Sequence, residues 1–335
     1  MKILFVHQGL QSFVKKDFDI LMEKHEVRGL KFTGKKGLFF NLLPDLWKLL
    51  LGVIWCDFTF SWFGKLHAFF AVLFSLIFKK KSIVVAGGED VVYAPEIKYG
   101  MFSFWWQKWC PLFVYRYADL ILPPSEFHNQ ILMENAKPNS RKVKVINHAF
   151  DYNVFKKDPL VSKDGSVITV GGVTYENLTR KGLKLFVEAA GLLPSIRFML
   201  IGPQPDDSIE VLKKIATPNV VFTGGVYGSD LIKVMAKATV YVQVSEYEGF
   251  GCSLAEAMLC EAVPVVSRKT ALPMVVGDAG LYLDDLTAED LAKNIRCALT
   301  MTEDAGKKAR DRIIKNFPLE MRRQQLLEAV RTLDA

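Results

Sequence analysis

Short apolar runs alternate with amphipathic, helix-length segments through both halves of this chain. Runs with the length and β-branched content of buried strands lie near residues 2–7, 57–61, 82–86, 166–171, 239–243 and 263–266. The segments between them carry apolar side chains every three or four residues, which predicts helices. Strands that alternate with helices form parallel sheets covered on both faces. The chain is therefore expected to be an α/β protein with two doubly wound parallel sheets.

Three local predictions can be checked directly against a structure. The aromatic stretch 100–117 has the composition of one helix, and 142–146 is expected to close the first half as a strand. Residues 180–192 are expected to form a single helix that begins near Lys181. The length of 335 residues fits two domains, with a polar junction near 147–158.

Glycines follow several of the predicted strands, among them Gly9, Gly172 and Gly224. Ligands of open parallel sheets bind outside the carboxyl ends of the strands. Two facing sheets would then create one central cleft, and these glycines are expected to lie at it.

The segment at 245–267, SEYEGFGCSLAEAMLCEAVPVVS, holds the most specific pattern in the chain. A predicted strand runs into a loop with Gly249, Phe250 and Gly251, and a helix begins near Cys252 and Ser253. Glycine allows close backbone approach, and a helix N-terminus attracts anions through its unpaired N–H groups. The segment therefore predicts a site for a diphosphate or for sugar hydroxyls.

Two carboxylates frame this predicted site. Glu248 precedes the helix and Glu256 lies about one turn inside it. A carboxylate repels phosphate, so both are expected to accept hydrogen bonds from hydroxyls, one from the ribose and one from the sugar.

The pattern Glu248-x7-Glu256, within EGFG-x-S-x-x-EAM and followed by Pro264-Val265-Val266, resembles the donor-binding signature of glycosyltransferase family 4. The resemblance implies the GT-B fold, in which two Rossmann-like domains face a central cleft. It implies an acceptor-binding domain over 1–152 and a nucleotide-sugar-binding domain over 153–317. The C-terminal helix, at 318–333, would pack back on the first domain.

The resemblance also implies a reaction, the transfer of a sugar from a UDP- or GDP-linked donor with retention at the anomeric carbon. Arg180 and Lys181 stand in a segment similar to the one that grips the donor diphosphate, and would stabilise the leaving group. The histidine common in the family is absent, so Asp90 or Glu89 is expected to contact the sugar. No metal or other cofactor is expected, because the histidines lack metal-ligand spacing.

These inferences assign roles to thirteen residues. Catalytic roles are expected for Lys181, Arg180, Glu248 and Asp90. Donor-binding roles are expected for Glu256, Gly249, Phe250, Gly251, Cys252, Ser253, Gly172, Gly9 and Gly224.

The excess positive charge lies in the first half of the chain. Residues 1–155 hold 20 Lys and Arg against 13 Asp and Glu, a net charge of +7, together with all six tryptophans. This composition suggests an anionic, amphipathic partner such as a membrane surface. Since the resemblance implies that the acceptor docks on this domain, we expect a glycan or polyprenyl-linked acceptor at the cytoplasmic face of an anionic membrane, reached through Trp105, Trp106, Lys108 and Trp109. In the alternative, the aromatics form a core and the lysines are solvated. No nucleic-acid-binding module is recognised.

The odd number of cysteines, five, fits a reducing compartment such as the cytoplasm. Two other functions fit the same sequence. One is a non-catalytic subunit that binds a sugar nucleotide, since Val173 and Met274 depart from the family pattern. The other is a different GT-B enzyme, such as a phosphorylase or an epimerase.

Overall fold

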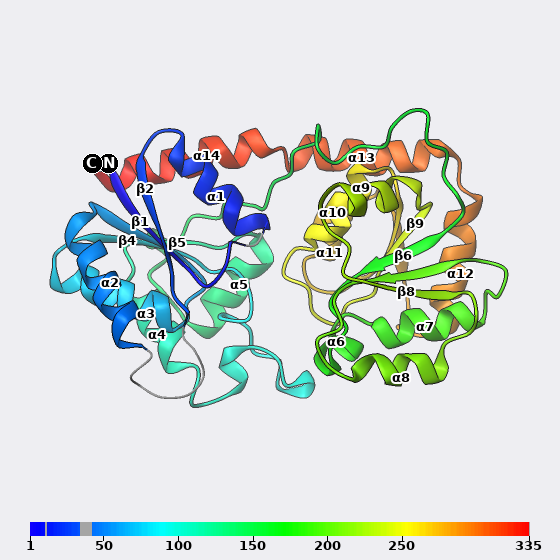
Figure 1. Ribbon diagram of the computed structural model, residues 1–335, viewed down its shortest axis with the longest axis horizontal. Helices are drawn as coiled ribbons and strands as arrows, with labels where there is room; N and C mark the ends of the chain where they lie inside the picture. The colour runs from blue at the N-terminus through cyan, green and yellow to red at the C-terminus, as the bar shows by residue number, and fades with distance from the viewer. Residues whose placement is uncertain (11, 34–41, 335) are drawn as a thin grey trace. The chain divides into compact units, whose positions relative to one another are not determined.

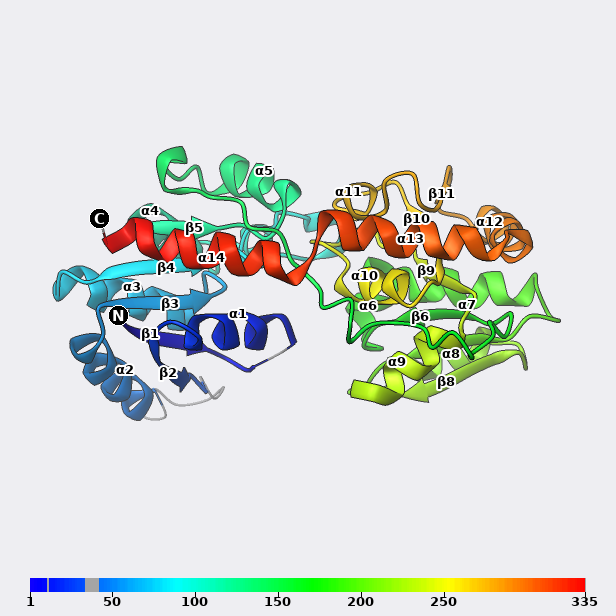
Figure 2. The same ribbon diagram turned by 90° about the horizontal axis from the view of Figure 1, so that it is seen from above.

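The computed structural model describes residues 1–10, 12–33 and 42–334. It divides into two compact units, which are Met1–His148 with Glu320–Ala335, and Ala149–Leu319. Each unit contains one parallel sheet with helices packed on it (Figures 1 and 2). The predicted architecture of two parallel-sheet α/β domains is confirmed, and the acceptor and donor roles of the two domains stay predictions.

Unit 1 is built from five strands, six helices and the short 3₁₀ turns between them, counted over the described residues. The strands are β1 (Lys2–His7), β2 (Glu26–Lys31), β3 (Phe58–Trp62), β4 (Lys81–Val85) and β5 (Leu120–Leu122). The helices are α1 (Ser12–Met22), α2 (Leu43–Trp55), α3 (Leu66–Ile77), α4 (Trp109–Tyr117), α5 (Glu126–Asn135) and α14 (Leu319–Asp334). The 3₁₀ turns are η2 (Pro95–Ile97), η3 (Met101–Ser103) and η4 (Ser140–Lys142).

The sheet of unit 1 has the strand order β2-β1-β3-β4-β5, which is the order of flavodoxin-like folds. Crossovers between parallel strands are right-handed, so their direction along the sheet decides which face the helix covers. The three crossovers that lead to β3, β4 and β5 run opposite to the one between β1 and β2. Helices α2, α3 and α4 therefore cover one face, and α1 covers the other.

The predicted helix at 100–117 is wrong in its first half, because α4 begins only at Trp109. Pro111 lacks an N–H and fits only the first turn of a helix, so a helix through 100–111 would lose a hydrogen bond and clash. The preceding chain forms a loop instead, in which the Ser103 hydroxyl donates to the Tyr99 carbonyl at 2.6 Å.

The predicted strand at 142–146 is also wrong. This segment pairs with β5 at a single bridge, between Ile121 and Val143, and the Lys144 N–H donates to the Ile121 carbonyl at 3.0 Å. β5 is followed by Pro123 and Pro124, which have no N–H to extend a ladder.

The C-terminal helix α14 is fixed to unit 1 through a buried ion pair. Arg322 donates to both oxygens of Asp17, each at 2.7 Å, and the two side chains are 2% and 0% exposed. The indole N–H of Trp62 donates to the same carboxylate at 3.1 Å. The remaining terminal nitrogen of the Arg322 guanidinium donates to the carbonyls of Ile146 and Asn147 at 2.8 and 2.7 Å. Every partner lies in unit 1, so α14 completes this unit.

Unit 2 alternates strands with helices, with two helices, α6 and α7, between the first two strands. The strands are β6 (Val167–Val170), β7 (Phe198–Ile201), β8 (Val220–Gly224), β9 (Val240–Gln243), β10 (Val263–Ser267) and β11 (Leu281–Leu283). The helices are α6 (Tyr175–Arg180), α7 (Leu183–Gly191), α8 (Ser208–Ile215), α9 (Gly228–Lys237), α10 (Cys252–Leu259), α11 (Leu272–Val276), α12 (Ala288–Thr300) and α13 (Glu303–Asn316). The strand order β11-β10-β9-β6-β7-β8 is that of the Rossmann fold.

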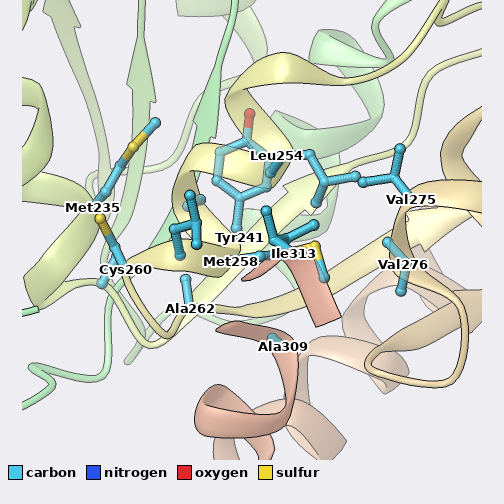
Figure 3. Close-up of a cluster of buried hydrophobic side chains, with 14 of the residues drawn as sticks. Met235, Tyr241, Leu254, Met258, Cys260, Ala262, Val275, Val276, Ala309 and Ile313 are labelled. Carbon is cyan, nitrogen blue, oxygen red and sulfur yellow. The ribbon is translucent and has the colours of Figure 1, made fainter. Parts of the chain in front are cut away.

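One core of unit 2 forms where α10 packs against the sheet (Figure 3). Leu254 and Met258 of α10 meet Tyr241 of β9, and Ala309 and Ile313 of α13 close the cluster. All five residues are 0% to 1% exposed, so α10 is held firmly along its length.

The predicted single helix at 180–192 is divided in two. Gly182 has a left-handed φ of +67°, and a Cβ there would lie 2.5 Å from the Val244 carbonyl oxygen. The chain therefore needs glycine at this point, and α6 ends before α7 begins. Lys181 lies between the two helices and does not begin one, and α11 was not predicted.

Lys163 lies where two helices of unit 2 end. Its ammonium donates to the Ala238 carbonyl at the end of α9 (2.9 Å) and to the Cys260 carbonyl at the end of α10 (2.7 Å). Burial lowers the pKa of this lysine from 10.5 to about 8. Between these two values the unfolded chain holds a proton that the folded chain has lost. The contribution of Lys163 to the free energy of unfolding should therefore rise with pH across this window, by up to about 1.4 kcal/mol per unit.

The free energy of unfolding of the wild type should therefore rise with pH relative to that of Lys163→Met. The cysteines whose pKa burial raises, Cys56, Cys110 and Cys260, lower stability at high pH in both proteins alike. Urea unfolding at pH 7.5 and pH 10, followed by far-ultraviolet circular dichroism, measures the difference between the two proteins. Lys156→Met, at an exposed site nearby, is the matched control and should behave as the wild type does. Equal pH dependence in the wild type and Lys163→Met would contradict the prediction.

Candidate functional site

The strand order of unit 2 reverses between β6 and β9, which lie next to each other in the sheet. Ligands of open parallel sheets bind outside the carboxyl ends of the strands at such a switch point. Two loops leave the sheet there. One follows β6 and begins with Gly171 and Gly172, and the other follows β9 and covers residues 244–251. The predicted site residues of unit 2 therefore belong mostly to these two loops and the helices that follow them.

The loop after β9 leads directly into α10. Gly251 precedes the helix with φ +90°, a conformation suited to glycine, and no side chain caps the first turn. Phe250 is 2% exposed and packs between Phe150 and Phe317, with ring centroids 5.8 and 5.1 Å away. This packing fixes the loop, so the first N–H groups of α10 form a preorganised anion-attracting end.

The Ser253 hydroxyl in the first turn of α10 accepts a hydrogen bond from Tyr241 at 2.8 Å. Burial raises the pKa of Tyr241, and the negative charges of Glu248 and Glu256 raise it further. The charges of both predicted carboxylates therefore act on the same phenol. Glu256 is half-buried and lies one turn inside α10.

Glu248 is held by three groups. Lys181 Nζ and Gln243 Nε2 donate to its Oε2 at 3.1 and 2.7 Å, and its backbone N–H donates to the Thr270 hydroxyl at 3.1 Å. Burial alone would raise the pKa of Glu248. The positive charges of Lys181 and Arg180 outweigh it, and the pKa lies below its ordinary value. Glu248 is therefore an ionised, oriented acceptor.

The position of Lys181 follows from the glycines beside it. A Cβ on Gly171 would lie 2.9 Å from Cδ of Lys181, so the lysine stem passes directly over this glycine. Gly202 approaches from the next strand, where a Cβ would lie 2.0 Å from the Gly171 carbonyl oxygen. The ammonium thus reaches the loop after β9 across the carboxyl ends of the strands. Its 20% exposure leaves it accessible to a ligand.

Arg180 ends α6 and ties it to the loop after β9. Its Nε donates to Glu176 at 2.9 Å, and a terminal nitrogen donates to the Asn177 side chain at 2.5 Å. Its carbonyl accepts from the Glu246 N–H at 2.8 Å. Asn177 in turn donates to the Gly172 carbonyl at 2.7 Å. The two switch-point loops are therefore joined by one hydrogen-bonded network.

Three predicted residues lie outside this group. Gly224 ends β8, two strands away from β6, with φ +71°. Gly9 follows β1 in unit 1, at the switch point of that sheet, and a Cβ there would meet nothing within 4 Å. Asp90 also lies in unit 1.

Asp90 makes the contacts of a buried structural group, and its expected role at the sugar stays a prediction. It is fully buried, and its two oxygens accept from the N–H groups of Gly64 and Gly88 at 2.6 and 2.8 Å and from the Tyr115 hydroxyl. Burial raises the pKa of Asp90. Asp90 therefore holds the loop after β4 together. Glu89, the other candidate, is partly exposed and pairs with Lys65.

Sequence reasoning missed Gln243, Thr270 and Asn177, which orient the predicted residues. Gln243 ends a strand of otherwise apolar residues and is 4% exposed, and a buried amide at that place is a signal that could have been used. Thr270 has φ +58°, which is strained for a β-branched residue and is typical of functional sites.

Two kinds of site have no counterpart in the described structure. Over residues 1–10, 12–33 and 42–334, no three His, Cys, Asp or Glu side chains are grouped so that they could hold a metal ion. No helix within those ranges is long and apolar enough to cross a membrane. Metal independence and membrane association stay predictions.

Residues 164–301 match the protein family described as "Glycosyl transferases group 1". The chain is 35% identical over 125 residues to "O-antigen chain mannosyltransferase B" of Escherichia coli, covering 35% of this chain and 33% of that protein. It is 26% identical over 200 residues to a Campylobacter jejuni protein, covering 57% of this chain and 53% of the relative. That relative is named "N-acetylgalactosamine-N,N'-diacetylbacillosaminyl-diphospho-undecaprenol 4-alpha-N-acetylgalactosaminyltransferase". The chain thus spans between a third and about half of these relatives.

Solved structures resemble the whole chain. HepE of Anabaena, in complex with UDP and glucose, matches with a TM-score of 0.80 and 18% identity over 98% of this chain and 99% of that one. WaaG, a glycosyltransferase involved in lipopolysaccharide biosynthesis, matches with a TM-score of 0.73 and 14% identity over 97% and 98%. These likenesses concern the fold. The GT-B prediction of two Rossmann-like domains is confirmed, as is the resemblance to group 1 glycosyltransferases over residues 164–301.

Proposed function

We propose that this protein is a retaining glycosyltransferase that moves a sugar from a nucleotide-diphosphate donor to a glycan or lipid-linked acceptor. The observation that carries the proposal is the contact of 3.1 Å between Lys181 and Glu248 at the β6–β9 switch point of unit 2. It sets a cation and an ionised carboxylate in the loops that lead to the N-terminus of α10, which no side chain caps. These groups complement a diphosphate and the hydroxyls attached to it.

In the proposed reaction the bond between the anomeric carbon and the diphosphate oxygen breaks, and negative charge develops on the leaving diphosphate. Lys181, Arg180 and the first N–H groups of α10 stabilise this charge, which is the main demand of the step. The acceptor hydroxyl forms the new bond on the face from which the diphosphate leaves, as the resemblance implies, and its proton passes to the leaving diphosphate oxygen. This charge stabilisation comes from the chain's own groups, so we expect no metal requirement.

The pairing of Glu248 with Lys181 argues against hydrolysis by two carboxylates. A retaining glycosidase needs a carboxylate free to attack the sugar. The ammonium and the Gln243 amide both donate to Oε2 of Glu248. A carboxylate held in this way is better suited to accept a hydrogen bond from a hydroxyl than to attack the sugar as a nucleophile.

The acceptor part of the proposal is supported by unit 1. Trp105, Trp106 and Trp109 are 78%, 53% and 50% exposed, so they are not core residues. Lys108 stands among them and is exposed as well. Aromatic and basic side chains together fit an amphipathic, anionic acceptor at the cytoplasmic face of a membrane.

A thermal-shift panel of UDP-, GDP-, ADP- and CMP-sugars without metal tests the donor site. One nucleotide class at about 100 times its Kd should stabilise the wild type by about 2.7 kcal/mol. Glu256→Ala should lose this stabilisation. Glu210→Ala, which removes an exposed carboxylate of α8, should keep it. No shift with any sugar nucleotide would overturn the proposal.

Turnover separates catalysis from binding alone. Nuclear magnetic resonance of the product's anomeric proton should show that the transferred sugar has the same anomeric configuration as in the donor. A donor that binds but is never consumed, with any acceptor tried, would favour the non-catalytic subunit.

A further inference from the structure

Helix α2 exposes an apolar stripe on the side that faces away from the sheet. Leu43, Trp47, Leu51 and Ile54 are spaced four, four and three residues apart and are 49%, 62%, 50% and 50% exposed. This spacing places them on one face of a helix. An ordinary surface helix is polar on its outer face, so α2 is built for contact with something apolar.

The stripe continues onto α3. Leu49 of α2 and Ala71 of α3 share one buried cluster, with Phe70 and Phe74 of α3 packed against it, so the two helices lie side by side (Figure 1). α3 holds no charged residue between Leu66 and Ile77. At its end Ile77 is 61% exposed and its neighbours Leu76 and Phe78 are 45% and 39% exposed.

Helix α4 flanks α3 on the other side. Phe69 of α3 lies 5.1 Å from the ring of Trp109 and 4.6 Å from the ring of Phe113. Trp109 and Tyr117 are 50% and 41% exposed on α4. The outer surface of α2, α3 and α4, here called the three-helix face, is therefore studded with large apolar side chains.

The charges of the three-helix face have one sign. Over residues 43–55, 65–81 and 104–117 the only acid is Asp45, which is 8% exposed and accepts from Thr33. Basic side chains of these ranges lie at Lys48, Lys65, Lys79, Lys80, Lys81, Lys108 and Arg116. Two of them have acidic neighbours outside the ranges, since Lys65 pairs with Glu89 and Lys81 with Asp119. The others add positive charge around the apolar surface.

We propose that the three-helix face docks on the surface of an anionic lipid bilayer. Apolar side chains enter the boundary between headgroups and acyl chains, and the lysines around them contact lipid phosphates. The helices lie on the bilayer and do not span it, since twelve residues of α3 measure only about 18 Å. A second copy of the chain fits less well, because a symmetric contact would bring like charges together. The inference rests on the proposed function only for its purpose, access to a lipid-linked acceptor.

Flotation with vesicles tests the proposal. The full-length protein should float with phosphatidylcholine vesicles that contain about 30% phosphatidylglycerol, and salt at about 0.5 M should weaken the binding. Trp47→Glu/Leu51→Glu, which charges the α2 stripe, should lower the bound fraction about tenfold. Lys79→Gln/Lys80→Gln should lower it about tenfold on anionic vesicles alone.

The matched control is Leu192→Glu/Ile215→Glu, which charges two exposed apolar residues of unit 2 and should bind as the wild type does. All variants should keep the donor-induced thermal shift, which shows that they are folded and separates this test from the proposed function. Binding that survives Trp47→Glu/Leu51→Glu would overturn the proposal. A wild-type dimer that this variant splits, seen by light scattering, would overturn it as well and identify a second copy as the partner.

Discussion

Replacing Lys181 by alanine is expected to lower kcat about a hundred- to a thousand-fold, the usual cost of losing one group that stabilises developing negative charge. Its Nζ lies 3.1 Å from Oε2 of Glu248, so a bound diphosphate would compete with this carboxylate for the ammonium. The rate is measured as consumption of the donor that the thermal-shift panel selects. Loss of the lysine should also raise the pKa of Glu248, since that positive charge lowers it. The acidic limb of the pH–rate profile should move to higher pH.

Lys184→Ala is the matched control. This lysine belongs to α7, three residues further along the chain, and is 56% exposed beside Glu188. It should leave kcat unchanged, because surface pairs of this kind contribute little. An unaltered kcat in Lys181→Ala would contradict the proposed role of the lysine in charge stabilisation. The donor site itself would still be tested by the thermal-shift panel.

Replacing Arg322 by alanine is expected to lower the free energy of unfolding of unit 1 by about 3–5 kcal/mol. Removing one member of a buried ion pair leaves the other charge uncompensated, and Asp17 is 0% exposed. The Asp17→Leu/Arg322→Leu double variant should recover part of the loss, because no buried charge then remains. All six tryptophans of the chain lie in unit 1, so tryptophan fluorescence in a urea titration reports on this unit alone.

The neighbouring arginine provides the control for this prediction. Arg323 pairs with Glu23 at the surface, with exposed fractions of 42% and 33%. Arg323→Ala should cost less than about 1 kcal/mol. If Arg322→Ala and Arg323→Ala lowered the free energy of unfolding equally, the buried pair would stabilise α14 no more than the surface pair does.

Most of the fold could be predicted because local sequence patterns indicate where its strands and helices begin and end. β1 has the predicted bounds, and α5 begins directly after Ser125, whose hydroxyl accepts from the His128 N–H as an N-cap. The wrong elements depend on single residues or on distant parts of the chain. Pro111 delays α4, and Gly182 divides a helix because Val244 passes next to it. That approach cannot be read from the sequence near residue 182.

The residue types of the candidate site could be predicted from the sequence, whereas most of the contacts between them could not. Lys181 and Glu248 were expected at one site, and they touch across 67 positions of sequence. Which groups hold them, Gln243 above all, follows from the neighbouring strands. The burial of Asp90 could not be predicted, because an acid that accepts three buried hydrogen bonds looks the same in a sequence as an acid that faces a substrate.

The order in which the chain is made does not match the order in which its units can be completed. Unit 2 ends at Leu319, whereas unit 1 needs α14, which follows it. During synthesis, the first 148 residues must wait with Asp17 uncompensated and the surface under α14 uncovered until Arg322 has emerged. Domains usually fold in the order of their synthesis. Here the unit that starts first is finished last, so a ribosome that stops shortly before residue 322 releases a complete unit 2 attached to an unfinished unit 1.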